Sequence, residues 1–244
     1  MKFSIITLTL LILLTGCFAS GPAVIKNDDP RLGKKSNSEQ QQIEKLEKQI
    51  IAVQDEKKSI EKKYIITKQK IRVHEYEIAK FGSIKRLLLE KRKLYSLQKE
   101  SSKVNKIGSD LQKNNNIIKY KNLEIRLQEA IKDDFYALGK LKKAELSSKI
   151  AELNLLKAKI VRKNEERLHG KDKKKQAKFI KVSEYENYFK SQKKEVKLKK
   201  KDRIRTQTLI KNAQLKLKNA AHLLPKGTKK KTTDTSDKTK EKSE

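Results

Sequence analysis

The chain has 244 residues and a formal net charge of +32, from 62 lysines and arginines against 30 acidic residues. Hydrophobic residues make up 35% of the sequence and aromatic residues 5%, with no tryptophan, which is lean for a large compact core. This balance argues against an ordinary globular domain. It favours long amphipathic helices, which bury one stripe of side chains and expose the rest to water.

The first residues have the pattern of an export signal. Lys2 precedes an apolar run over residues 3–14, which is shorter than the roughly 20 residues that a membrane-spanning helix needs. The run leads into Leu14, Thr15, Gly16 and Cys17: an aliphatic residue, a small one, glycine and cysteine. Cys17 is the sole cysteine of the sequence, so no internal disulfide accounts for it.

This short run resembles the lipobox that signal peptidase II cleaves in bacterial lipoproteins. The resemblance implies that residues 1–16 are a signal peptide and that Cys17 carries a diacylglycerol and an N-acyl chain, with no other cofactor. Two or three acyl chains anchor a protein stably in a membrane, whereas a single chain does not. We therefore expect an exported protein in the cell envelope, in the outer membrane. An ordinary cleaved signal with an incidental cysteine is the alternative.

The part that follows the lipobox is expected to be helical. Residues 17–37 contain glycine and proline turns without periodicity, which predicts a flexible tether. Ser38, with Gln41 at the capping-box spacing, is a candidate helix start. A heptad seam then predicts one long helix, or a kinked helix pair, over residues 38–107. Lys57, Thr67 and His74 are its polar positions, and its apolar positions are Ile43, Leu46, Ile50, Val53, Ile60, Tyr64, Ile71, Ile78 and Phe81.

Breaks in the pattern divide the remaining chain. Gly108 and the run Asn114–Asn116 predict a turn over residues 108–116, because glycine and asparagine tolerate left-handed backbone angles. A long helix is expected over 117–168, a basic helix over 171–224 and a disordered lysine-rich tail over 225–244. The fold class is all-α: a long antiparallel helical hairpin or coiled coil, extended to an elongated bundle of three or four helices with disordered ends.

Residues for catalysis or metal binding do not converge in this pattern. His74 is expected to be a polar seam residue, while His169 and His222 fall at helix ends, where a cation complements the helix dipole. No two histidines have the spacing of a shared metal site. The sequence therefore predicts a non-enzymatic protein with no metal.

Two basic strings are candidate polyanion sites. Lys173, Lys174, Lys175 and Lys178 match an XBBBXXBX pattern, and Lys199, Lys200, Lys201 and Arg203 match a shorter XBBXBX pattern, where B is a basic residue. Basic residues three or four apart share a helix face and can follow a row of sulfates or phosphates. Solvated helix faces are the equal alternative. The nearby Tyr185, Tyr188 and Phe189 fit a buried helical stripe better than a set of base-stacking rings.

The whole profile is similar in style to that of spirochaete (Borrelia-type) helical surface lipoproteins. That resemblance implies a lipid-anchored surface protein that binds glycosaminoglycans, anionic lipid, or a host or envelope protein. The export signal argues against nucleic acid as the physiological partner. A periplasm-facing coiled-coil lipoprotein that acts as a spacer or assembly partner is the alternative. The seam leaves open whether the helices pair within one chain or form a homo-oligomer.

Overall fold

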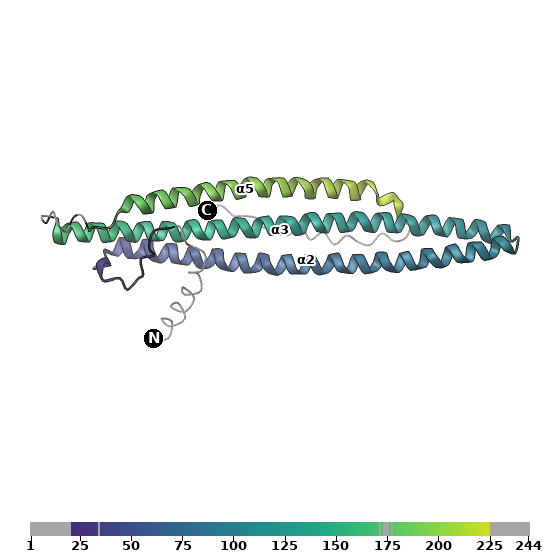
Figure 1. Cartoon of the computed structure of the whole chain (residues 1–244), viewed down its shortest axis with the longest axis horizontal. Helices are drawn as coiled ribbons and strands as arrows, with labels where there is room; N and C mark the ends of the chain where they lie inside the picture. The colour runs from purple at the N-terminus through teal and green to yellow at the C-terminus, as the bar shows by residue number, and fades with distance from the viewer. Residues whose placement is uncertain (1–20, 34, 171, 173–175, 177, 225–244) are drawn as a thin grey trace. The chain divides into compact units, whose positions relative to one another are not determined.

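A computed structural model describes residues 21–33, 35–170, 172, 176 and 178–224. Its long helices are α2 (Asn37–Leu97), α3 (Ser101–His169) and α5 (Val182–Asn219), with the short 3-10 turns η2 (Pro30–Leu32) and η3 (Ala221–Leu223) (Figure 1). No strand occurs among these residues, so the expected all-α class is confirmed. The same part of the chain contains no helix with an apolar stretch that could cross a bilayer.

The helices contribute to two compact units. The first contains the described residues up to Lys63 and those from Phe135 to Arg205. The second contains Tyr64–Asp134 with the described residues from Thr206 to Leu224. In the first unit, α3 is linked to α2 through the Lys142–Glu56 ion pair and to α5 through Lys159–Glu186.

The N-terminal segment of the first unit belongs to its core. Ile25 and Leu32 are almost fully buried, at 2% and 1% exposure. The buried ammonium of Lys157 donates to the Ile25 carbonyl (3.0 Å), and the Tyr185 hydroxyl donates to the Ala23 carbonyl (2.8 Å). The predicted flexible tether over 17–37 is therefore wrong for this segment, because two isolated apolar side chains hold it on the helices. Its first residues, Cys17–Ser20, lie outside the described part.

The start of α2 is set by a capping box two residues earlier than expected. The Ser36 hydroxyl accepts from the Glu39 amide (3.2 Å), and the Glu39 carboxylate accepts from the Ser36 amide (2.8 Å). This reciprocal pair satisfies two amides that the first helical turn cannot. The predicted cap at Ser38 is wrong. The Glu39 carboxylate also accepts from the Lys163 ammonium of α3 (2.9 Å), which, together with the Ser36 amide, lowers the pKa of Glu39 to about 2.

The turn between α2 and α3 lies at residues 98–100. Lys99 has a φ of 59°, in the left-handed region. The Glu100 amide donates to the Tyr95 carbonyl and the Lys99 amide to the Ser96 carbonyl, which together make a Schellman motif. The chain thus reverses at a lysine rather than at a glycine.

The predicted turn at 108–116 is wrong, because those residues are helical. Ile107 and Leu111 are buried, and burial of their side chains offsets the roughly 1 kcal/mol that Gly108 costs in a helix. The Asn114 side chain is also buried, and its amide donates to the Phe81 carbonyl on α2 (2.9 Å). The helix that was predicted to end at residue 107 therefore ends at Leu97. The helix that was predicted to begin at residue 117 begins at Ser101.

The position of this turn determines the register of the hairpin. In the first unit, Lys142 and Glu56 meet, and each is 43 residues from Lys99. In the second unit, Lys121 and Glu77 meet, and each is 22 residues from Lys99. The pairing of α2 with α3 is therefore antiparallel within each unit and centred on Lys99.

The predicted basic helix over 171–224 is shorter than expected. Helix α3 ends at His169, and α5 begins only at Val182. Between them, Phe179 is buried under the Arg162 guanidinium, 4.8 Å from its ring centre, and the Ile180 amide donates to the Glu165 carboxylate (2.9 Å). These contacts hold Phe179 and Ile180 against α3 just before α5 begins. The tail from residue 225 onwards lies outside the described residues.

The left-handed turn gives a stability prediction. Replacing Lys99 with glycine removes the cost of a side chain at positive φ, about 1 kcal/mol. We expect Lys99→Gly to raise the midpoint of thermal unfolding by about 2–4 °C, measured by circular dichroism. Lys91→Gly, within α2, is the matched control and should lower it by a similar amount. A decrease for both variants would contradict the assigned turn.

The Glu39 cap gives a pH dependence. Its pKa falls from the usual value of 4.5 to about 2 in the folded chain. The charged cap therefore stabilises the fold above pH 4.5, and this stabilisation disappears as the pH falls towards 2. We expect Glu39→Gln to reduce the free energy of unfolding by about 1 kcal/mol at neutral pH. The difference from wild type should vanish near the folded pKa. Glu75→Gln, an exposed control, should show little change at either pH.

Candidate functional site

The predicted site residues fall partly within the described chain. The lipobox residues Leu14, Thr15, Gly16 and Cys17 lie outside it, as do Lys173, Lys174 and Lys175. Lys178 is exposed just before the buried Phe179. The first basic string is therefore represented in the structure by one lysine, and the second by all four of its residues.

Helix α5 separates the members of the second basic string. Lys199 is half-buried and forms ion pairs with Glu195 (3.1 Å) and Asp202 (3.8 Å) on its own helix. Arg203 is also half-buried, whereas Lys200 and Lys201 are exposed. Lys199 and Lys201 lie on different sides of the helix because two helical residues are separated by 200°. The string predicted as one site is therefore not one surface.

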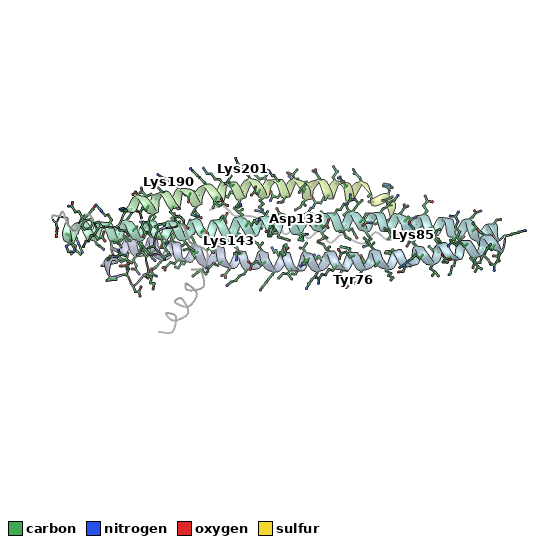
Figure 2. All side chains as sticks on the ribbon, viewed as in Figure 1. Tyr76, Lys85, Asp133, Lys143, Lys190 and Lys201 are labelled. Atoms are coloured by element: carbon green, nitrogen blue, oxygen red, sulfur yellow. The ribbon has the colours of Figure 1, made fainter. Side chains whose placement is uncertain are left out.

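A continuous basic surface runs along the exposed side of α5. Lys190, Lys194, Lys197 and Lys201 have the spacing i, i+4, i+7 and i+11, which places them on one face. All four are exposed, and we call them the basic stripe. Figure 2 shows Lys190 and Lys201 both projecting away from the neighbouring helix. The stripe is about 16 Å long at 1.5 Å per residue.

The charge balance of α5 makes this surface strongly positive. The helix contains twelve lysines and arginines but only four acidic residues. Glu195 and Asp202 point away from the stripe, where Lys199 pairs with them. Exposed Lys193, Lys200 and Arg205 flank the stripe. Like charges four residues apart destabilise a helix by a few tenths of a kcal/mol per pair, so the stripe carries a cost that a bound polyanion would relieve.

The aromatic residues beside the stripe have structural contacts. Tyr185 is buried with 5% exposure, and burial raises the pKa of its hydroxyl. The Tyr188 ring approaches Gly21, where an added side-chain carbon would lie only 2.9 Å from it. Phe189 lies under the Lys193 ammonium, 4.6 Å from the ring centre. The expectation that the tyrosines belong to a packed helix face holds for Tyr185, and Gly21 leaves room for Tyr188.

A second group of ionisable side chains lies between α2 and α3 in the second unit. His74 Nδ1 is 3.2 Å from Glu77 Oε2 and 3.5 Å from Glu124 Oε2. The Lys121 ammonium lies 2.8 Å from Glu77 Oε2 and 2.7 Å from Glu124 Oε2. We call these four residues the polar cluster. His74 is half-buried in the seam, as the sequence predicts.

The polar cluster is electrostatically coupled. The hydrogen bond from Lys121 holds the pKa of Glu77 below its usual value. Burial by itself would lower the pKa of Lys121, but the carboxylates of Glu124 and Glu77 outweigh it and raise that pKa. The Glu77 carboxylate is therefore ionised at neutral pH. The i,i+3 pairs His74–Glu77 and Lys121–Glu124 are visible in the sequence, but their meeting depends on the register of the hairpin.

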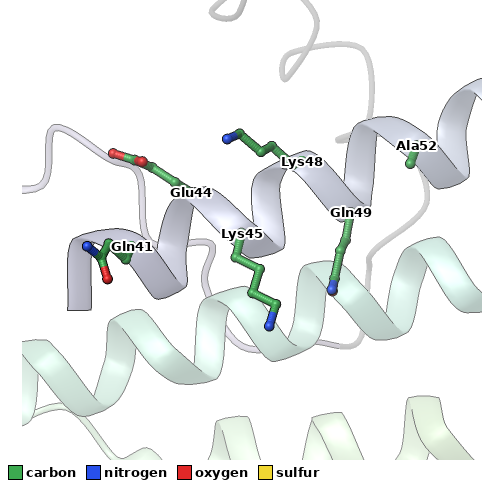
Figure 3. Close-up of a pocket in the computed structure, with 6 residues that line it drawn as sticks. All are labelled: Gln41, Glu44, Lys45, Lys48, Gln49 and Ala52. Carbon is green, nitrogen blue, oxygen red and sulfur yellow. The ribbon is translucent and has the colours of Figure 1, made fainter. Parts of the chain in front are cut away.

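A hollow of about 460 Å³ lies beside α2 in the first unit. Figure 3 shows its lining, with Lys45 and Gln49 directed towards the neighbouring helix and Lys48 directed away. All its residues come from α2: Gln41, Glu44, Lys45, Lys48, Gln49 and Ala52. A lining from a single helix does not bring chemical groups together from different elements, so we assign no reaction to it.

Comparisons with protein-family models, with curated proteins and with solved structures found no match for this chain. The candidate surfaces therefore stand on their geometry and chemistry.

Proposed function

We propose that the protein is a non-enzymatic, lipid-anchored envelope protein whose basic stripe binds polyanions at the cell surface. The observation that carries the binding proposal is the row of exposed lysines Lys190, Lys194, Lys197 and Lys201 on one face of α5. The lipobox-like run ending at Cys17 supports the anchor and the compartment. The partners are then glycosaminoglycans, anionic envelope polymers or anionic lipid rather than the genome.

The chemistry of the stripe suits a flexible polyanion. Its ammonium groups are point charges on flexible stems, so they can follow sulfates or phosphates without a defined hydrogen-bond geometry. Binding of this kind releases counterions and weakens steeply with salt. It also tolerates variation in the ligand, because the four lysines are all exposed on one helix face and present no fixed geometry to it.

A structural role as a spacer or assembly partner is the second candidate. Helix α2 carries exposed apolar side chains at seven-residue steps in the second unit: Ile66, Val73, Leu87 and Leu94, with Lys80 at the step between. Such spacing is that of a helix–helix seam. A protein that assembled through this face would use its basic stripe only to stay soluble.

A charge-matched pair of variants tests the stripe. Replacing Lys190, Lys194, Lys197 and Lys201 with glutamine should weaken heparin binding strongly, because four contacts from one face are lost. The slope of log affinity against log salt should fall by about three. The measurement is fluorescence titration with heparin at several salt concentrations.

The control for this test removes four exposed lysines that do not form one face: Lys48, Lys106, Lys119 and Lys143. It has the same net charge as the stripe variant and should retain most of the affinity. Equal losses in both variants would show that binding follows total charge, and the structural role would then be favoured.

The lipid anchor is tested separately through Cys17. Metabolic labelling with palmitate should mark the wild-type protein, and Cys17→Ser should abolish the label and release the protein from the membrane fraction. The reason is that no other thiol is present to take the diacylglycerol. Ser20→Ala is the control and should be labelled normally. Undiminished labelling of Cys17→Ser would refute the anchor and the compartment assigned from it.

A further inference from the structure

The polar cluster brings three metal-binding side chains together from two helices. His74 and Glu77 are one turn apart on α2, and Glu124 faces them from α3. One ligand atom from each lies within 4.8 Å of the others. All three side chains are partly buried, so a bound ion would have few competing waters.

Two of the three donor–donor distances are those of a tetrahedral zinc site, and the two carboxylate oxygens lie within 4.8 Å of each other. Ligands at the usual zinc distance of about 2.0–2.1 Å are about 3.3 Å apart in a tetrahedron. His74 Nδ1 lies 3.2 Å from the Glu77 oxygen and 3.5 Å from the Glu124 oxygen. One imidazole and two carboxylates also suit zinc better than magnesium or calcium, which prefer larger sets of oxygen ligands.

The Lys121 ammonium occupies the place of a cation in this structure. It lies 2.8 Å and 2.7 Å from the same two carboxylate oxygens that would bind the ion. Two carboxylates and one ammonium together carry a net charge of −1. A divalent ion that replaced the ammonium would neutralise both carboxylates. Lys121 has a long, flexible stem that lets its ammonium swing away while its backbone stays in α3.

We propose that the polar cluster is an exchangeable zinc site in which His74 Nδ1, Glu77 and Glu124 bind the ion and Lys121 holds their charge when zinc is absent. The fourth position is taken by water. Binding requires the His74 proton to lie on Nε2, so that Nδ1 offers a lone pair. The ion then joins α2 to α3 in the second unit, where Ile71, Ile107 and Leu111 are among the few buried apolar residues.

Calorimetric titration with zinc chloride tests this site. The full chain carries Cys17→Ser for the experiment, which removes the sole thiol as a competing ligand. We expect saturable binding of about one zinc per chain, with a midpoint of thermal unfolding that rises as zinc is added. H74Q and E124Q should each weaken zinc binding by at least about tenfold. K121M should strengthen it, because the competing ammonium is gone.

Two controls separate this site from unspecific binding and from misfolding. H222Q removes an exposed histidine that contacts the Asn219 carbonyl, and it should leave zinc affinity unchanged. Helix content at 222 nm identifies any variant that fails to fold. The zinc-dependent shift in unfolding of the parent chain, with Cys17→Ser alone, does not depend on any change in the polar cluster. The proposal is overturned if this parent chain shows no saturable binding, or if its binding survives both H74Q and E124Q. Neither result bears on heparin binding or on the lipid anchor.

Discussion

The left-handed turn at Lys99 is the constraint on which the pairing of α2 and α3 depends. A hairpin of two long helices can pair in many registers, because the same charged and apolar residue types recur along each helix. The Schellman motif at residues 98–100 selects one of them. It brings Glu56 to Lys142 in the first unit and Glu77 to Lys121 in the second. A turn at the predicted residues 108–116 would have shifted the register of α3 against α2 by more than twenty residues. Neither of these pairs could then have met.

The two units are stabilised by different interactions. The first has a continuous apolar core into which the N-terminal segment inserts Ile25 and Leu32. In the second, buried positions include Thr67 and Asn114, and polar contacts such as the Asn114–Phe81 hydrogen bond join its helices. Exposed ion pairs contribute little to stability, so the many i,i+3 and i,i+4 pairs of the chain cannot replace a core. The second unit is therefore the part in which a bound ion between helices would have the larger effect.

Features that depend on a repeating pattern of apolar residues were predicted correctly from the sequence. Features that depend on single residues, such as the position of the turn, were not. The heptad pattern gave the helical class, the polar seam positions Thr67 and His74, and a packed role for Tyr185. It could not locate the turn, because Lys99 carries no sequence signal for positive φ while Gly108 and Asn114 do. Nor could it show that Ile25 and Leu32 pack, since two isolated apolar residues have no period. The polar cluster was missed for a related reason. Its two i,i+3 pairs can be read from the sequence, but they meet only in the helix register that the turn at Lys99 sets, and the turn was predicted elsewhere.

In the candidate binding surface, the positions of the lysines around the helix decide which of them can bind together, and a contiguous sequence motif does not show these positions. A contiguous string such as Lys199–Lys200–Lys201 spreads its charges around the helix, and Glu195 and Asp202 pair with the first of them. A polyanion that lies along α5 meets instead the lysines at three- and four-residue steps, most of which belong to no contiguous motif. Positive charges placed in this way repel one another along the helix, and the fold gains nothing from them. A row of unfavourable but regularly spaced charges is what a site for an anionic polymer requires, because the ligand supplies the compensating charge.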